Sequence, residues 1–370
     1  MFPSTVQLAS ITLCKTARIL YYFWVDKFGM RKISILVMAM FFLFGCKQKS
    51  IVHPTFYFWK TDYHNDKPET NHLDQFKSKA LYVRIMDVDF DPDRQQAVPV
   101  SPIKFSDPLP PQVKIVPVVF LVNRIFYDTD SNKTKILANR ISNFVDAKVK
   151  QAGKQGFAEL QIDCDWTKTT REKYFNFLKQ LKAQPFLKGK TISVTLRLHQ
   201  VKNVVTSGIP PVEKAMLMCY NMGNLRKYGD QNSILDQHEM DIYLKDFLES
   251  YPLKLDVALP LFEWAVIFRN KEYAGISKRL NKSRLRDKKL FRQRGNSTLY
   301  DLLIDYPAAG LKQGDVLRWE EVSAKDLLAT STFLSRYLKP DERNIVFYHL
   351  DTDLLKHFTH EELQKVIANF

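Results

Sequence analysis

Cysteine is scarce in this chain, which has four cysteines among its 370 residues. Cys14, Cys46, Cys164 and Cys219 show neither the spacing of a zinc site nor the framework of a disulfide-stapled domain. Cys164 and Cys219 fall within strand-like apolar runs, so we expect both to pack as small apolar side chains. The cysteine pattern therefore gives no support to a small disulfide-rich or zinc-bound class.

Other features are also missing from the sequence. It has no glycine-rich phosphate loop and no clear metal-ligand spacing, so we expect no cofactor and no bound metal. No Gly/Ser-rich or long proline-rich linker divides the chain, and no internal repeat or low-complexity tract stands out. These absences favour a single large domain after the N-terminal region.

One short apolar run lies near the N-terminus. The positive segment 30–32 precedes the run 33–45, and Cys46 follows it. This run of 13 residues is too short to span a bilayer comfortably and fits a secretory signal. Its end, LFGC, resembles a bacterial lipobox, so we interpret 30–46 as a lipoprotein signal peptide with Cys46 as the lipidation site. An uncleaved membrane anchor is the alternative.

Residues 1–29 have no role in this interpretation. We expect them to be a non-native leader from a start codon assigned too early, with Met30 as the start. Signal and lipid together place the protein in the bacterial cell envelope. The formal net charge is +15, and removing residues 1–46 takes away five basic residues and one acid, which leaves +11. A basic protein outside the cytoplasm favours anionic partners such as lipid headgroups or acidic polysaccharide.

The most informative stretch is ELQIDCDWT, residues 159–167. Because side chains alternate along a strand, Glu159, Gln161, Asp163 and Asp165 share one face, and the other face is apolar. An interior lined with carboxylates near its mouth is typical of an enzymatic (β/α) barrel. An edge strand with one wet face is the alternative.

The same design recurs along the chain. Strand-like runs alternate with helical ones, and the strands are expected at 55–59, 80–90, 114–122, 159–167, 191–198, 214–221, 255–262 and 344–350. Eight strands with intervening helices predict an α/β fold, a single (β/α)8 TIM barrel over residues 47–370. The proline-rich segment 99–111 fits this pattern poorly. The interval 265–343 exceeds a normal crossover, so we expect an excursion between strands seven and eight.

Capping signals place several helices. Ser131 is expected to start one helix, Ser323 another that ends near Leu338, and capping boxes are expected at Thr169 and Thr359. Within the excursion, residues 278–294 hold nine basic residues and one acid. This segment is interpreted either as a solvated, mobile loop or as a contact site for an anionic surface.

Candidate functional residues gather at the strand ends, because active sites of such barrels lie at the carboxyl ends of the strands. Carboxylates, aromatics and amides on one rim suit a carbohydrate. The candidates are Asp87, Asp163, Asp165, Trp166, Arg197, Tyr220, Asn221, Glu263, Trp264 and Asp351. In the structural alternative, the two tryptophans only cover the barrel top.

Two expectations concern charge. Asp163 and Asp165 repel each other when both are ionised, so the inner carboxyl should have a raised pKa unless Arg197 or Tyr220 compensates. Arg84, Glu159 and Arg197 are a candidate structural ion-pair network inside the barrel.

Two motifs carry a family resemblance. IDCDWT (162–167) resembles the strand-four motif Asp-x-Asp-x-Glu of chitinase-like glycoside hydrolases of family eighteen, and MCYN (218–221) resembles that family's Met-x-Tyr-Asp. The resemblance implies a (β/α)8 barrel that acts on N-acetylhexosamine polymers, with Asp163 and Asp165 as supporting aspartates. Tyr220 and Asn221 would orient the acetamido group. Thr167 stands where the family has its catalytic Glu, so the resemblance supports the fold more than the activity.

Three functions follow as alternatives. The first is a glycoside hydrolase that uses Asp163, Asp165 and Glu263. The second is a non-catalytic glycan-binding lipoprotein, and the third is an envelope scaffold that uses its basic segment. The expected partners are a polysaccharide and, through the lipid, a membrane. No nucleic acid is expected, and the protein should be a monomer.

Overall fold

The computed structural model describes residues 50–127, 129–277 and 280–370. The predicted leader, the signal peptide and the lipidation site at Cys46 therefore lie outside the described residues. Within the described ranges, each helix is too short or too polar to cross a membrane.

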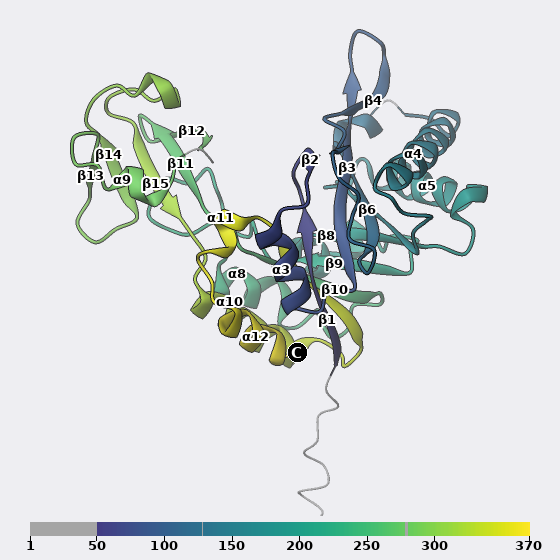
Figure 1. Cartoon of the computed structure of the whole chain (residues 1–370). Helices are drawn as coiled ribbons and strands as arrows, with labels where there is room; N and C mark the ends of the chain where they lie inside the picture. Colours follow the sequence, from purple (N-terminus) through teal and green to yellow (C-terminus); the bar gives the residue numbers. More distant parts are fainter. Residues whose placement is uncertain (1–49, 128, 278–279) are drawn as a thin grey trace, which may run out of the picture. The chain divides into compact units, whose positions relative to one another are not determined.

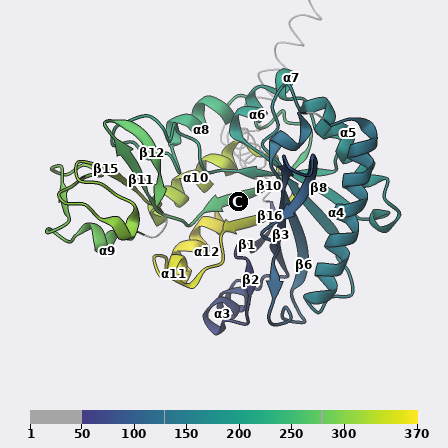
Figure 2. The ribbon, with the colours of Figure 1, turned by 90° about the horizontal axis from the view of Figure 1, so that it is seen from above.

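Eight parallel strands close into a barrel. They are β1 (Ile51–Phe58), β3 (Ala80–Asp91), β6 (Lys114–Leu121), β7 (Glu159–Asp163), β8 (Thr191–Leu196), β9 (Lys214–Met218), β10 (Lys254–Pro260) and β16 (Glu342–Tyr348). Each strand pairs with the next in this order, and β1 pairs with both β16 and β3, which closes the sheet. Figure 2 shows the barrel strands surrounded by helices. The predicted (β/α)8 barrel is confirmed.

Helices cover the outside of the barrel. They are α3 (Lys67–Gln75), α4 (Ser131–Gln151), α5 (Arg171–Lys182), α6 (Leu198–Lys202), α7 (Val204–Ser207), α8 (Gln237–Leu244), α10 (Ala324–Tyr337), α11 (Thr352–Leu355) and α12 (His360–Ala368). Single 3₁₀ turns add η1 (Asn123–Phe126), η2 (Pro185–Leu187) and η3 (Pro307–Ala309).

The capping predictions have mixed outcomes. Ser323 and Thr359 are the N-caps of α10 and α12, as expected, and the predicted capping box at Thr359 is confirmed; Ser323 forms a capping box that was not predicted. The N-cap of α4 is Asp130 rather than Ser131, because the Asp130 carboxylate accepts the amide of Lys133. The box expected at Thr169 is wrong: the N-cap of α5 is Thr170, and its hydroxyl instead donates to Asn123 at 2.6 Å.

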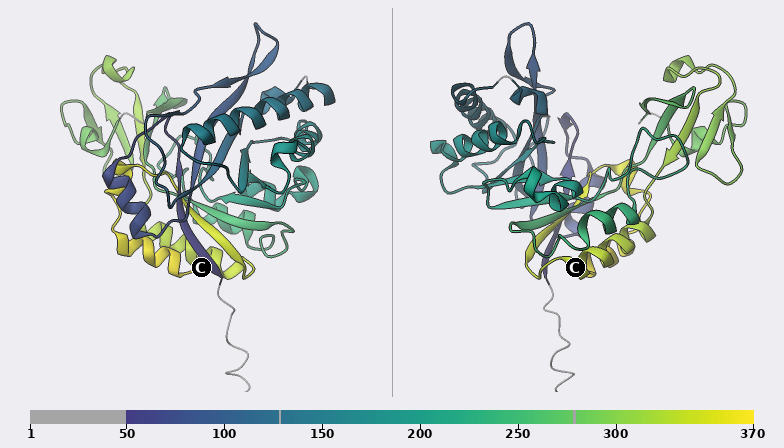
Figure 3. Two further views of the ribbon diagram at one scale, coloured as in Figure 1. Left: turned by 45° about the vertical axis from the view of Figure 1, so that its right-hand side comes forward. Right: turned by 180° about the vertical axis from the view of Figure 1, so that it is seen from behind.

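One crossover has no helix. After β3 the chain turns back as β4 (Gln96–Val100), antiparallel to β3, and Figure 3 shows this hairpin extending beyond the barrel strands. The next segment forms β5 (Lys104–Phe105), which pairs with β2 (Asp62–Tyr63). Prolines are frequent in 99–111, and proline lacks the amide hydrogen that a helix interior requires. This composition explains why the crossover is extended.

A second sheet is inserted between β10 and β16. It contains β11 (Trp264–Arg269), β12 (Glu272–Ser277), β13 (Phe291–Gln293), β14 (Leu299–Leu302) and β15 (Val316–Glu320), with the short helix α9 (Lys282–Leu285). All its pairings are antiparallel, in the order β12-β11-β15-β14-β13 (Figure 1). We call this unit the inserted sheet. Leu285, Phe291, Leu317 and Trp319 are buried in its own small core.

The barrel interior is polar along β7, as the alternation predicts. Glu159, Gln161 and Asp163 are all buried. At the amino-terminal end of the barrel, the Lys214 ammonium lies 2.8 Å from the Glu159 carboxylate and 2.7 Å from that of Asp256. Tyr57 donates to Gln161 at 2.5 Å one layer above. Cross-barrel contacts of this kind satisfy polar groups that water does not reach.

The predicted network of Arg84, Glu159 and Arg197 is wrong. Glu159 pairs with Lys214, whereas the two arginines pair with different aspartates nearer the opposite rim. Arg84 cannot reach Glu159 because a register shift between Arg84 and Met86 brings Asp87 into ion-pairing distance of the guanidinium, at 2.6 Å.

The contacts of Lys214 with Glu159 and Asp256 predict the effect of removing this lysine. In Lys214→Met, Glu159 and Asp256 are left buried and unpaired, so we expect the free energy of unfolding to fall by about 3–5 kcal/mol. Urea unfolding at pH 7 measures this change. The control is Lys254→Met, at the paired register position on β10 but exposed, which should shift stability by less than about 0.5 kcal/mol. Equal effects of the two variants would contradict the interpretation.

Candidate functional site

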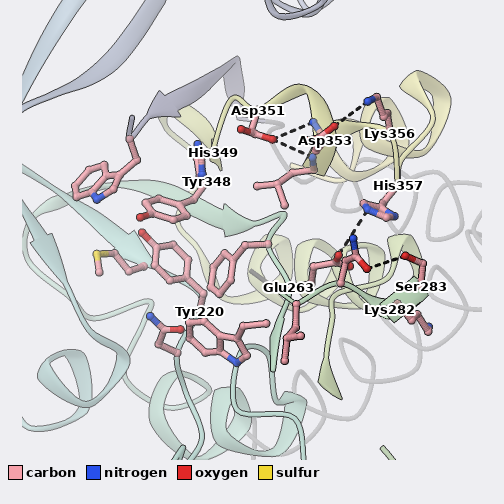
Figure 4. Close-up of a pocket in the computed structure, with 18 of the residues that line it drawn as sticks. Tyr220, Glu263, Lys282, Ser283, Tyr348, His349, Asp351, Asp353, Lys356 and His357 are labelled. Carbon is pink, nitrogen blue, oxygen red and sulfur yellow. Dashed lines mark hydrogen bonds and ion pairs between the residues drawn. The ribbon is translucent and has the colours of Figure 1, made fainter. Parts of the chain in front are cut away.

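A cavity of about 830 Å³ opens where the barrel strands end, and Figure 4 shows the side chains around it. Its lining comes from the carboxyl ends of six barrel strands and from the inserted sheet next to α9. The lining residues used below are Trp59, Asp163, Arg197, Tyr220, Asn221, Phe262, Glu263, Trp264, Lys282, Ser283, Tyr348, Asp351 and His357. This volume suits a small ligand or a few sugar units.

Aromatic rings form a connected set along this cavity. The ring of Tyr348 has its centroid 5.4 Å from that of Trp59, 5.2 Å from Tyr220 and 5.7 Å from Phe262. Phe262 in turn lies 5.0 Å from Trp264. Trp59 and Tyr348 are half-buried, so parts of their faces remain accessible. We call these five side chains the aromatic cluster.

Asp163 is the buried carboxyl of the cavity. It accepts a hydrogen bond from the Thr195 hydroxyl at 2.7 Å. Burial and the nearby charge of Asp165 raise the pKa of Asp163 to about 6, even though Thr195 and Arg197 act in the opposite direction. The expected raised pKa of the inner aspartate is therefore confirmed.

Asp165 is held by a neighbouring cation. The Arg197 guanidinium donates two hydrogen bonds to its carboxylate, at 2.7 and 3.0 Å. Asp165 follows the last residue of β7 by two positions, and about half of its side chain is exposed. It is not among the residues that line the cavity, whereas Arg197 is. Both carboxylate oxygens are thus already engaged in a bidentate pair.

Glu263 lies on the opposite part of the lining, at the start of the inserted sheet. Burial raises the pKa of its carboxyl, although the nearby His357 acts in the opposite direction. The imidazole Nε2 of His357 lies 3.8 Å from the Glu263 carboxylate, as drawn in Figure 4. Glu263 and Asp163 are therefore two carboxyl groups of one cavity that favour the protonated form more than usual.

A buried carboxylate fixes the position of Trp264. Glu320 accepts hydrogen bonds from the Trp264 indole at 2.8 Å and from both the amide and the hydroxyl of Ser233. The Arg318 guanidinium, fully buried, donates to the same carboxylate at 2.6 Å and to backbone carbonyls of the 225–229 loop. This carboxylate connects the inserted sheet to the loop after β9 and to the aromatic cluster.

Asp351 completes the rim beside Trp59. It caps α11 by accepting the amides of Asp353 and Leu354, and it pairs with Lys60 at 2.9 Å. Burial alone would raise the pKa of Asp351, but the Lys60 ammonium outweighs it and lowers the pKa. We therefore interpret Asp351 as an ionised residue that shapes the rim.

Most of the predicted site residues line this one cavity, namely Asp163, Arg197, Tyr220, Asn221, Glu263, Trp264 and Asp351. The structure places Asp165, Trp166 and Asp87 elsewhere. Trp166 is buried, stacks on Tyr174 of α5 and donates to the Ser207 carbonyl. Asp87 pairs with Arg84.

The sequence interpretation missed Trp59 and Tyr348. Both were detectable, because alternation places Trp59 on the face of Tyr57 and Tyr348 on the face of Asn344. His357 follows α11 and Lys282 begins α9, and no local sequence pattern predicts that these two side chains approach the barrel.

Metal binding finds no support in this cavity. Across the ranges that the structure describes, no three His, Cys, Asp or Glu side chains are grouped to hold a metal ion. The cavity chemistry available from the chain itself is proton transfer by carboxyls, hydrogen bonding and aromatic stacking.

Comparisons with known proteins show the fold. No protein-family model matches the chain, and no curated protein matches its sequence. Among solved structures it is similar to the spore cortex-lytic enzyme SleL of Bacillus cereus, at 13% identity over 87% of this chain and 75% of that one, with a TM-score of 0.52. This likeness supports the barrel fold alone.

Two chitinase structures are also similar to the chain. They are the Ostrinia furnacalis Group IV chitinase in complex with allosamidin, at 12% identity over 86% and 98% of the two chains with a TM-score of 0.48, and a class V chitinase from Pseudomonas fluorescens Pf-5, at 10% over 86% and 99% with a TM-score of 0.47. The barrel that the predicted resemblance implies is shown by the strand pairing and by the likeness to SleL.

The raised pKa of Asp163 predicts a pH-dependent cost to stability. Between its ordinary value of 3.8 and about 6 the folded chain holds the proton more tightly than the unfolded chain, so this group's contribution to stability falls as pH rises and is constant above that range. Asp163→Asn removes the buried charge. At pH 8 we expect the free energy of unfolding of this variant to be about 1–3 kcal/mol higher than that of the unmodified chain. At pH 4 the two values should be the same.

Urea unfolding at the two pH values measures this difference. The matched control is Asp93→Asn, an exposed aspartate in the β3–β4 turn. Its effect should be the same at both pH values. If the stability difference between Asp163→Asn and the unmodified chain is also the same at both pH values, the ionised Asp163 carboxylate does not destabilise the fold.

Proposed function

We propose that the cavity at the carboxyl ends of the barrel strands binds a glycan. The observation that carries this proposal is the aromatic cluster, of which Trp59 and Tyr348 are half-buried and line the cavity together with carboxyl, amide and basic groups. Sugar rings present apolar faces to aromatic side chains and hydroxyls to polar ones, so a mixed lining of this kind suits them. The barrel fold shared with SleL, a spore cortex-lytic enzyme by its title, is consistent with this proposal as an analogy.

Binding without hydrolysis is the function favoured by the carboxylates. Asp165, which would be the acid/base in a two-carboxylate mechanism, is held by Arg197 and does not line the cavity. Thr167 occupies the position where the resembling family has its catalytic Glu, and a hydroxyl is a poor proton donor near neutral pH. The positions that family chemistry would use are therefore paired or replaced.

Hydrolysis is the second candidate, favoured by one observation. Asp163 and Glu263 line the same cavity, and burial raises the pKa of both carboxyls. A carboxyl with a raised pKa can deliver a proton to a glycosidic oxygen near neutral pH. In this candidate mechanism Glu263, on the more accessible wall beside His357, is the proton donor.

The binding proposal predicts which tryptophan matters. Trp59→Ala removes the accessible face of the aromatic cluster, so we expect affinity for chitopentaose to fall about five- to tenfold, as the loss of one stacking contact implies. Titration calorimetry with the full chain measures the affinity. The control is Trp166→Phe, which alters a tryptophan buried against α5 and should leave affinity unchanged.

The same experiment separates the two candidates. Loss of affinity in Trp166→Phe but not in Trp59→Ala would place binding outside the cavity. Release of shorter oligosaccharides during incubation would establish hydrolysis. In that event Glu263→Gln should lower turnover about 100-fold or more and leave chitopentaose affinity largely intact.

We also propose that the protein is a lipoprotein of the bacterial cell envelope. The support is the sequence pattern that ends at Cys46. Mass analysis of the N-terminal peptide of the native protein should find a lipid-modified Cys46 as its first residue. An N-terminus upstream of Cys46 would contradict the lipid anchor and leave the glycan proposal standing.

A further inference from the structure

A dense group of cations lies on the inserted sheet next to the cavity. Residues 282–294, which contain α9 and β13, carry seven Lys or Arg side chains and one acid, Asp287. Protein surfaces usually mix charges of both signs, so such an excess in 13 residues produces a strong local positive potential. This segment is the densest positive region that the sequence analysis singled out.

The backbone of this segment is held in place. Leu285 and Phe291 are each 2% exposed and belong to the core of the inserted sheet. The Asn281 carboxamide caps α9 by accepting the amide of Arg284 at 2.9 Å. These anchors give the cations defined positions, which favours the contact-site interpretation over that of a mobile loop.

The cations divide into paired and unpaired sets. Lys282 pairs with Glu321, and Arg294 pairs with Asp301 at 2.6 Å. Arg286, Lys288 and Lys289 are exposed, and no carboxylate of the described residues lies within ion-pairing distance of them. We call these three residues the basic patch. Their charges remain available to an external anion.

The basic patch continues directly from the cavity. Lys282 and Ser283 of α9 line the cavity, and Arg286 follows Ser283 by three residues, which corresponds to about 5 Å along a helix axis. A chain that occupies the cavity and leaves it on this side therefore passes the basic patch. The cavity itself is not basic, because the lysines and the arginine of its lining, Arg197, Lys282 and Lys356, are paired with Asp165, Glu321 and Asp353.

From these observations we infer that the glycan is acidic, a polysaccharide with carboxylate or other anionic substituents. Its sugar rings occupy the cavity, and its anionic groups contact Arg286, Lys288 and Lys289. This inference rests on the proposed glycan binding and narrows its ligand class. The aromatic cluster supplies salt-independent affinity, and the basic patch supplies salt-dependent affinity.

The test compares a neutral and an anionic oligosaccharide that both contain N-acetylhexosamine, namely chitopentaose and a hyaluronan oligosaccharide of similar length. With the full chain at 50 mM salt we expect tighter binding of the hyaluronan oligosaccharide, and the advantage should disappear at 0.5 M salt. The triple variant Arg286→Gln, Lys288→Gln, Lys289→Gln should lose about tenfold in hyaluronan affinity at low salt and keep its chitopentaose affinity.

A control with the same loss of charge is available. Lys114, Lys179 and Lys188 are exposed and lie on β6, on α5 and after η2, away from the inserted sheet in the chain. Their triple Gln variant should bind both oligosaccharides like the unmodified chain. If both triple variants lose the same affinity for the hyaluronan oligosaccharide, the loss is explained by net charge alone and the inference is wrong.

Two further outcomes are decisive. If the basic-patch variant keeps its hyaluronan affinity but loses binding to vesicles of anionic phospholipid, the patch contacts a membrane and the inference is wrong. Failure of the underlying glycan proposal has a different signature: Trp59→Ala then leaves the affinity for both oligosaccharides unchanged.

Discussion

Closure of the sheet at β1 is the constraint on which the rest of the structure depends. β1 pairs in parallel with β16 on one side and with β3 on the other, so every barrel strand has two neighbours. A closed parallel barrel sends the carboxyl ends of all its strands to one rim and converts their inward side chains into a shared interior. Trp59 and Tyr348, almost 300 residues apart, meet at 5.4 Å because the first and last strands are adjacent.

The interior divides into an end that stabilises the fold and an end that is free for a ligand. Near the amino-terminal end, the Lys214 ammonium contacts the carboxyls of both Glu159 and Asp256, which fixes these strands to one another. Near the carboxyl end, Asp163 accepts a hydrogen bond from the Thr195 hydroxyl, and burial raises its pKa to about 6. Carboxyls whose pKa is raised by burial commonly mark functional sites. Burial raises the pKa of Glu159 as well, but Lys214 and Ser193 contact its carboxyl, and among these two residues only Asp163 lines the cavity.

Sequence alone predicted the barrel well and the site in part, for identifiable reasons. The eight barrel strands were located as short apolar runs that alternate with helical patterns, because a parallel strand of such a barrel is buried on both faces. Strand alternation assigns Trp166 to the face of Cys164, toward α5, so its placement away from the cavity was predictable. Asp87 was not predictable, because a register shift after Arg84 changes which side chains meet. The bidentate pairing of Asp165 with Arg197 was not predictable either, because it depends on where β7 ends. Contributions from the inserted sheet and from His357 depend on tertiary packing that no local pattern encodes.

The inserted sheet contributes polar and basic side chains to the cavity at the carboxyl ends of the barrel strands. Glu320 and Arg318 are buried together, and a buried ion pair stabilises little in itself because desolvation opposes the attraction. Its effect here is positional: the same carboxylate orients Trp264 and Ser233, so the aromatic cluster and the inserted sheet have one common anchor. Any ligand that contacts Trp264 is consequently placed beside α9, where Lys282 and Ser283 line the cavity and the unpaired cations follow. In the function proposed above, aromatic recognition of a sugar and electrostatic recognition of its charge are coupled through this single buried carboxylate.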